Sequence, residues 1–291
     1  METSELLKKV RKIEIKTRGL SNQIFSGEYH SAFKGRGMAF SEVREYQPGD
    51  PIRSIDWNVT ARFNHPYVKV FEEEREITMM LIIDVSASEN FGTKGMLKRE
   101  LLTEVAAVLA FSAVQNNDKI GVILFSDRIE KFIPPKKGKT HILRIIRELI
   151  DFKPEGHGTN IEEALRFFNN VTKKRSIAFL ISDMMDTNYE KPLRIARQRH
   201  DLVTLIPRDI AEDTLPDLGM LPMKDFESGR TVWVDTSDKT VRERYAKART
   251  QHHLETVNQL RKIGVDYAEL YTNRSYVKPL MQLFKQREAR A

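Results

Sequence analysis

Three oxygen-bearing side chains alternate in the segment Asp84-Val85-Ser86-Ala87-Ser88. One loop therefore offers a carboxylate and two hydroxyls at positions 84, 86 and 88. Hard oxygen donors of low total charge suit an octahedral divalent cation that keeps several waters, such as Mg²⁺ or Mn²⁺. The segment is predicted to hold such a cation at Asp84, Ser86 and Ser88.

Two further segments carry oxygen donors at comparable points of the chain. The glycine-rich segment at residues 156–160 offers the Thr159 hydroxyl just before a predicted helix, and Asp183 ends the apolar run SIAFLISD. All three segments fall at transitions from strand to helix, and open α/β sheets bind their ligands at the carboxyl ends of the strands. Asp and Ser in such places are also common helix caps and turn formers. The convergence of three segments favours a metal site over capping.

The elements that would position these donors begin at residue 77, where apolar β-branched runs start to alternate with helical patterns. This alternation predicts an α/β fold with a doubly wound, mostly parallel sheet and helices on both faces. The predicted strands are residues 77–84, 119–126, 129–134, 176–183, 201–207, 231–235 and 265–271. The predicted helices are residues 95–115, 140–151, 161–171, 192–200 and 240–263. A tight hairpin at residues 127 and 128 makes 129–134 an antiparallel edge strand.

The remaining segments define the predicted domain organisation. Residues 1–19 read as an amphipathic helix, residues 20–76 as a small strand-and-loop subdomain, and residues 77–291 as the main domain with a polar loop insertion at 208–230. Within the subdomain an ion-pair network is predicted to fasten it to the sheet, with Tyr46 and Trp57 as packing anchors. The network would comprise Arg44, Glu45, Arg53, Asp56 and Arg62.

Composition limits the chemistry and the surroundings of the protein. Without cysteine, thiolate metal sites and disulfides are excluded, which suits a reducing compartment, and we expect a cytoplasmic protein. No apolar run reaches the roughly 18 residues of a membrane-spanning helix. The chain has 48 Lys and Arg against 41 Asp and Glu, a net charge of +7, but the two signs are interspersed. Nucleic-acid binding is therefore an alternative rather than the leading prediction.

The donor set resembles a known metal centre. Asp84-x-Ser86-x-Ser88, Thr159 and Asp183 are similar to the three loops of the metal-ion-dependent adhesion site of von Willebrand A domains. In that family the serines and the threonine contact the cation, the aspartates act largely through water, and a carboxylate from a protein partner completes the shell. The resemblance implies a von Willebrand A-like fold and a protein partner that supplies this carboxylate.

A second resemblance covers most of residues 30 to 272. The segment RGMAFSEVREYQPGD at residues 36–50, the pattern Arg53-x-x-Asp56-Trp57 and the run EEER at residues 72–75 are similar to the signature of the bacterial domain-of-unknown-function family fifty-eight. Members of that family are often encoded beside MoxR-type AAA+ ATPases. The resemblance implies a metal-dependent adaptor that works with such an ATPase, or on its client.

An enzyme is not the leading prediction, because the segments above contain no recognisable catalytic constellation. A phosphatase that used Asp84 as its nucleophile would normally carry a positioned lysine and a second carboxylate two residues on, where this chain has Ser86. We therefore expect a metal-dependent protein-binding adaptor, with nucleic-acid binding and, further behind, metal-dependent phosphoesterase activity as the alternatives.

Overall fold

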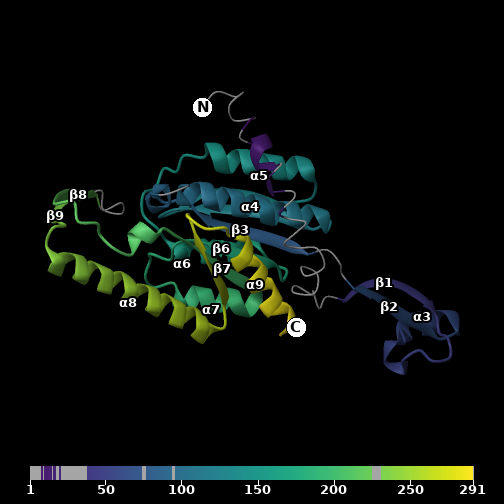
Figure 1. The fold of residues 1–291 in the computed structure, drawn as a ribbon. Coiled ribbons are helices and arrows are strands. Elements are labelled where there is room, and N and C mark those ends of the chain that lie inside the picture. The colour runs from purple at the N-terminus through teal and green to yellow at the C-terminus, as the bar shows by residue number, and fades with distance from the viewer. Residues whose placement is uncertain are drawn as a thin grey trace. The chain divides into compact units, whose positions relative to one another are not determined.

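Six strands pair into one sheet in the larger of two compact units (Figure 1). The computed structural model describes residues 8, 10–14, 16, 17, 20, 38–73, 77–93, 96–224 and 231–290. In order across the sheet the strands are β10 (Asp266–Tyr271), β7 (Asp201–Arg208), β6 (Ile177–Ile181), β3 (Thr78–Asp84), β4 (Lys119–Phe125) and β5 (Ile129–Lys136). All neighbours are parallel except β4 and β5. The predicted α/β sheet with an antiparallel edge strand is confirmed.

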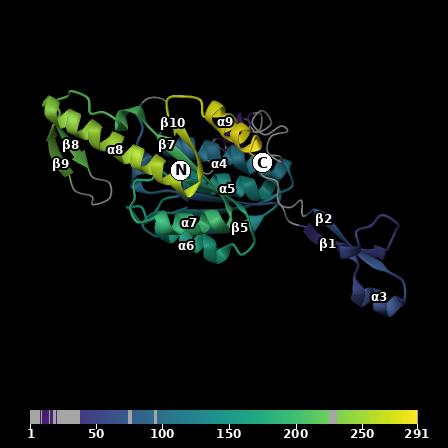
Figure 2. The same cartoon turned by 90° about the horizontal axis from the view of Figure 1, so that it is seen from below.

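Helices cover both faces of this sheet (Figures 1 and 2). Helices α4 (Lys98–Gln115) and α5 (Lys139–Asp151) lie on one face, and α6 (Ile161–Val171) and α7 (Glu190–Arg199) lie on the other. Helix α8 (Lys239–Ile263) ends at Gly264, which adopts the left-handed conformation that glycine tolerates best. Each of these helices lies within a few residues of its predicted position.

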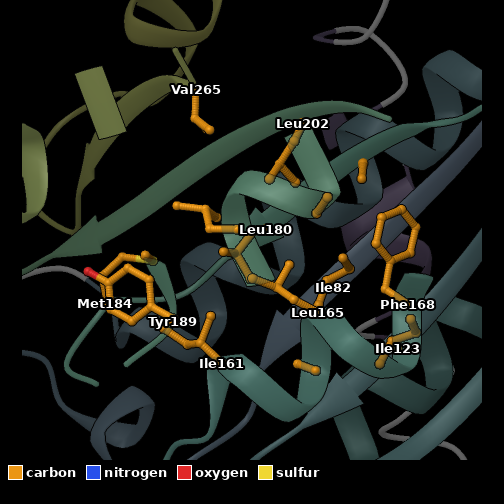
Figure 3. Close-up of a cluster of buried hydrophobic side chains, with 14 of the residues drawn as sticks. Ile82, Ile123, Ile161, Leu165, Phe168, Leu180, Met184, Tyr189, Leu202 and Val265 are labelled. Atoms are coloured by element: carbon orange, nitrogen blue, oxygen red, sulfur yellow. The ribbon is translucent and has the colours of Figure 1, made fainter. Parts of the chain in front are cut away.

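The buried core on the α6 side is built from alternate residues of the strands. Met80 and Ile82 of β3 pack with Ile161, Leu165 and Phe168 of α6 (Figure 3). Residues two apart on a strand share a face, so one strand contributes every second side chain to this layer. Each such side chain stabilises the fold by about 1.5–3 kcal/mol, and together they hold the carboxyl ends of β3 and β6 in register.

Helix α9 (Val277–Glu288) was not predicted. It packs near the amino-terminal part of the sheet, where Phe284 meets Phe179 of β6 edge-on, with ring centroids 6.5 Å apart and an interplanar angle of 76°. Leu280 and Phe284 are fully buried. The C-terminal segment therefore belongs to the core, although charged residues are interspersed among its apolar ones.

The prediction for residues 208–235 was wrong in two respects. The stretch 208–230 contains the short helix η3 (Ile210–Glu212) and the strand β8 (Met220–Lys224), so it is not simply a loop. The strand β9 (Thr231–Asp235) pairs antiparallel with β8 and lies outside the six-stranded sheet. An apolar run of this length indicates a strand but does not specify its partner.

The smaller unit, Lys34–Ile77, contains an antiparallel pair of strands, β1 (Met38–Glu45) and β2 (Tyr67–Glu73). Between them lie η1 (Ile52–Ser54) and α3 (Trp57–Phe63). The predicted five-residue network does not form among the described residues. Arg44 pairs instead with Asp50, while Asp56 caps α3 and lies 3.4 Å from Lys69. The indole of Trp57 is exposed, so it is not a packing anchor within this unit.

Only part of the predicted N-terminal helix lies among the described residues, and residues 8, 10–14, 16, 17 and 20 are helical. Val10 is buried, and Lys16 forms an ion pair with Glu104 of α4 at 2.6 Å. No helix in the described part of the chain combines the length and the apolar character that crossing a bilayer requires.

His200, at the end of α7, makes the stability of the fold depend on pH. Its ring is buried against Phe168 and lies 3.1 Å from the Ser176 hydroxyl, and burial lowers the pKa of His200 to about 4 from an ordinary 6.5. The unfolded chain therefore takes up a proton at a pH where the fold still excludes it. The contribution of the neutral, buried ring to the free energy of unfolding is complete above pH 6.5. About 3 kcal/mol of that contribution is lost as the pH falls from 6.5 to 4. Urea titrations across this range should show a flatter pH profile for His200→Gln than for wild type, and parallel profiles would contradict the prediction.

Candidate metal centre

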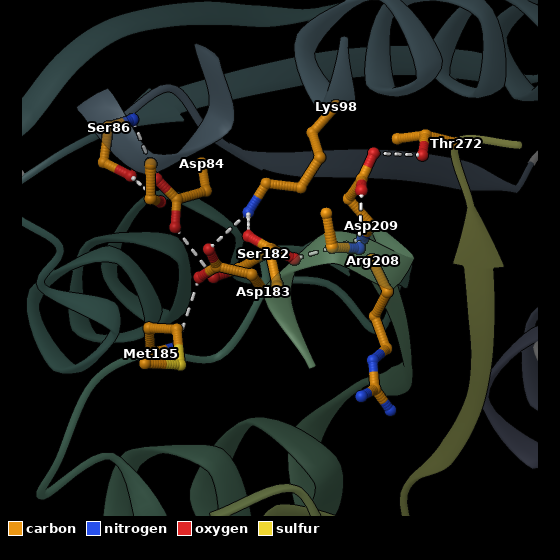
Figure 4. Close-up of polar contacts among 12 residues, drawn as sticks. Asp84, Ser86, Lys98, Ser182, Asp183, Met185, Arg208, Asp209 and Thr272 are labelled. Atoms are coloured by element: carbon orange, nitrogen blue, oxygen red, sulfur yellow. Dashed lines mark hydrogen bonds and ion pairs between the residues drawn. The ribbon is translucent and has the colours of Figure 1, made fainter. Parts of the chain in front are cut away.

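Asp84 occupies the carboxyl end of β3, at the centre of the sheet (Figure 4). Its Oδ1 accepts a hydrogen bond of 2.9 Å from the backbone N–H of Ser86, which turns the chain into the short helix η2 (Ala87–Asn90). The hydroxyls of Ser86 and Ser88 lie 3.1 Å apart. The three predicted donors of this segment therefore gather around one turn, and both Asp84 and Ser86 are buried.

Asp183 reaches the same place from the neighbouring strand. Strands β3 and β6 are parallel and pair Ile83 with Ile181, so the residues that follow them lie side by side. Ser182 donates a 2.7 Å hydrogen bond to Oδ2 of Asp84, and the Ser88 hydroxyl bonds to Asp183. Four of the five predicted site residues, Asp84, Ser86, Ser88 and Asp183, thus lie in one hydrogen-bonded cluster.

Thr159 lies beside this cluster without joining it. The backbone N–H of Ala87 donates to the carbonyl oxygen of His157 at 3.3 Å, which places the segment 156–160 against the Asp84 turn. The Thr159 side chain is half-buried, and no hydrogen bond joins it to the other four predicted donors in the described structure.

Glu130 of β5 holds the segment 156–160 in place. Its Oε1 accepts hydrogen bonds from the Gly156 backbone N–H at 2.7 Å and from the Ser126 hydroxyl at 2.6 Å. A Cβ atom at position 156 would collide with the side chains of Ser126 and Asp127. Glycine is therefore required at this position by close packing, and its role is to bring the segment up to the Asp84 turn.

A buried lysine and two glutamates join the cluster, and none of them was predicted. The Lys98 ammonium, fully buried at the start of α4, lies 2.9 Å from Oδ2 of Asp183 and 2.8 Å from Oε1 of Glu212 in η3. Glu89 follows Ser88 directly and is also buried. The available signals were an acidic residue next to the Asp84 motif and a lysine at the head of a helix that is largely apolar from Val105 to Val114.

The pKa values of the two aspartates in the cluster are shifted in opposite directions. Burial, followed by the charge of Asp183, raises the pKa of Asp84 to about 7. Burial also raises the pKa of Asp183, but the Lys98 ammonium and the hydrogen bonds from Lys98 and Ser88 outweigh it and leave that pKa below its ordinary value. Burial alone would lower the pKa of Lys98, yet the surrounding carboxylates raise it. Four carboxyl groups thus share one ammonium, an arrangement that favours additional positive charge.

The donor set fits a hard divalent cation. One oxygen each of Asp84, Glu89 and Asp183 lies within 4.8 Å of the other two. Ligands on opposite sides of a Mg²⁺ or Mn²⁺ ion are about 4.2 Å apart, because each metal–oxygen bond is about 2.1 Å. Carboxylate and hydroxyl oxygens are the ligands that such ions prefer, so the chemistry of these residues suits the predicted cofactor.

Comparison with known protein families assigns the chain to one of them. The family model described as "Protein of unknown function DUF58" matches residues 42–255. The chain belongs to the DUF58 family. The matched region includes β3, β6 and the Asp84 cluster, as well as most of the smaller unit.

Two curated relatives of this DUF58 chain carry the name of an uncharacterised protein. The Mycobacterium bovis protein Mb1516 is 27% identical over 290 residues, which cover 99% of this chain and 91% of the relative. The Bacillus subtilis protein YeaD is 28% identical over 109 residues, which cover 38% of this chain and 25% of that protein.

Solved structures are more distant. The conserved hypothetical protein BatB from Bacteroides thetaiotaomicron is 15% identical, with a TM-score of 0.47, over 74% of this DUF58 chain and all of that chain. An aerotolerance-related membrane protein from Bacteroides fragilis is also 15% identical, with a TM-score of 0.46 and the same coverage.

Proposed function

We propose that this DUF58 protein is a metal-dependent protein-binding adaptor. A Mg²⁺ or Mn²⁺ ion is held by Asp84, Ser86, Ser88 and Asp183, with Thr159 on the adjacent segment, as in the adhesion site of von Willebrand A domains. A carboxylate of a protein partner completes the coordination shell. The partner is a MoxR-type AAA+ ATPase or a client of that ATPase.

One observation carries the proposal: two loops from different strands place their oxygens in one buried cluster. Asp84 accepts from Ser182, and Asp183 accepts from Ser88, so each carboxylate is oriented by the opposite loop. A helix cap or a turn needs only local bonds and would not require this cross-strand arrangement. Oriented carboxylates in a buried, acidic setting are what a hard cation requires from its protein ligands.

The chain contains a matched control for this argument. Ser237 donates its backbone N–H to Oδ1 of Asp235 at 2.9 Å, the same local turn that Ser86 and Asp84 form. This second Asp-x-Ser turn is exposed and follows β9, where no second strand supplies a carboxylate within the described structure. Substitutions in the two turns therefore separate loss of the metal cluster from loss of a turn.

The test is capture of partners by tagged protein from a native lysate, with Mg²⁺ or with EDTA. We expect wild type and Asp235→Ala/Ser237→Ala to retain an AAA+ ATPase in Mg²⁺ and to lose it in EDTA. Asp84→Ala/Ser86→Ala should lose it in both buffers. Capture that ignores both chelation and the Asp84 substitutions would contradict the adaptor mechanism.

The two alternative functions give different results in parallel assays. Nucleic-acid binding would fall steeply with salt and would ignore EDTA, because counterion release governs it. A phosphoesterase would hydrolyse a chromogenic phosphate ester in Mn²⁺ and lose that activity on Asp84→Ala.

A further inference from the structure

Glu89 is a buried carboxylate that the described structure leaves without a hydrogen-bond partner. It lies in η2, directly after Ser88, and is 1% exposed. Neither Oε1 nor Oε2 has a donor within hydrogen-bonding distance. Burying a carboxylate without a partner costs several kcal/mol, so its presence in the core needs an explanation.

Nearby cations of the protein do not satisfy Glu89. The Lys98 ammonium is close enough to favour ionisation of Glu89, but its hydrogen bonds go to Asp183 and Glu212. Burial and the charges of Asp183, Asp84 and Glu212 act in the opposite direction and raise the pKa of Glu89 well above its usual range. Protonation would discharge the group, yet both of its oxygens stand without a hydrogen bond in the described structure.

The position of Glu89 supplies the explanation. One of its oxygens lies within 4.8 Å of an oxygen of Asp84 and of an oxygen of Asp183, so the three carboxyl groups face a common point. Asp84 and Asp183 each make hydrogen bonds that orient them, whereas both oxygens of Glu89 are free of such bonds in the described structure. A cation at the common point would give Glu89 the partner that the protein does not supply.

We propose that Glu89 is a carboxylate ligand of the divalent cation, in addition to the donors of the Asp84 motif and Asp183. This inference rests on the metal site of the proposed function. Glu89 raises the negative charge of the ligand set, which strengthens binding of a hard cation.

Two substitutions distinguish the loss of a metal ligand from the loss of a nearby negative charge. Glu89→Gln removes a carboxylate that faces the common point, whereas Glu212→Gln removes a carboxylate of the same charge that bonds Lys98 instead. Mn²⁺ affinity is measured for both variants, wild type and Asp84→Ala by isothermal titration calorimetry. We expect Glu89→Gln to weaken Mn²⁺ binding by about tenfold or more, and Glu212→Gln to weaken it less.

Thermal unfolding in EDTA provides the second readout. A ligand that is uncompensated without metal should not stabilise the metal-free fold, so Glu89→Gln should melt at the wild-type temperature or above it, with a smaller rise on addition of Mn²⁺. A structural glutamate would give the opposite pattern, with a lower melting temperature in EDTA and unchanged Mn²⁺ affinity. If Glu89→Gln did not fold, Glu89→Asp, which withdraws the carboxylate by one methylene, would serve in the same titration.

The outcomes separate this inference from the proposed function. If Asp84→Ala abolishes Mn²⁺ binding while Glu89→Gln binds like wild type, or no more weakly than Glu212→Gln, the role of Glu89 is overturned and the metal site stands. If wild type binds no Mn²⁺, both proposals fail.

Discussion

Lys98→Met should lower the free energy of unfolding by about 3–5 kcal/mol in metal-free protein, because it leaves buried carboxylates without their counter-charge. The methionine side chain fills a similar volume, so the loss reports on charge and hydrogen bonding rather than on a cavity. Asp183 and Glu212 each lose a bond below 3 Å to a fully buried ammonium. Addition of Mg²⁺ or Mn²⁺ should recover part of the loss, because a cation in the cluster replaces the missing positive charge.

Urea denaturation in EDTA and in Mg²⁺ measures both parts of this prediction. Lys131→Met is the matched control, since Lys131 pairs with Glu148 at 2.6 Å while both side chains remain partly exposed. That substitution should cost less than about 1 kcal/mol, with no dependence on metal. Equal losses in the two variants would show that the buried ion pairs of Lys98 contribute no more to stability than the exposed pair of Lys131.

Phe284→Ala should cost about 3–5 kcal/mol, the range for removing a large aromatic side chain from a core. Phe284 is fully buried in α9 and meets Phe179 of the central strand β6. The cavity would open next to β6, the strand that Asp183 follows. The prediction concerns the free energy of unfolding and not the binding of a metal.

The matched control for Phe284 lies on the same helix. Gln286 is exposed, so Gln286→Ala should change the free energy of unfolding by less than about 0.5 kcal/mol. Chemical denaturation of the two variants and wild type gives the comparison. A loss below about 1 kcal/mol for Phe284→Ala would mean that α9 contributes little to the core, contrary to the observed burial.

The sheet was predictable from sequence because its strands are buried on both faces. Runs such as ITMMLIID and SIAFLISD are apolar almost throughout, and the segments between them carry helical periodicity. Helix α9 was not predicted because its apolar residues are interspersed with Lys278, Lys285 and Arg287. The charged residues near the C-terminus indicated an exposed segment instead. Its burial depends on the sheet surface that it covers, which local sequence does not report.

The candidate site was predictable in part, for a different reason. Asp84 and Asp183 follow apolar strands, and parallel strands bring their carboxyl ends to one edge. The Asp-x-Ser turn itself was a weaker guide than it seemed, because Asp235 and Ser237 form the same turn on the surface. Lys98 was missed because the Asp183 that it neutralises is 85 residues away, and no local pattern links the two.

The bond from Ser182 to Asp84 joins residues 98 apart in the chain. The cluster therefore exists only after β3 and β6 have aligned, a non-local pairing of the kind that slows folding. Interactions that form after the transition state change the rate of unfolding and leave the rate of folding nearly unaltered. A cation bound at this cluster stabilises the folded state, and the part of that stabilisation that is absent from the transition state would slow unfolding and extend the lifetime of the fold.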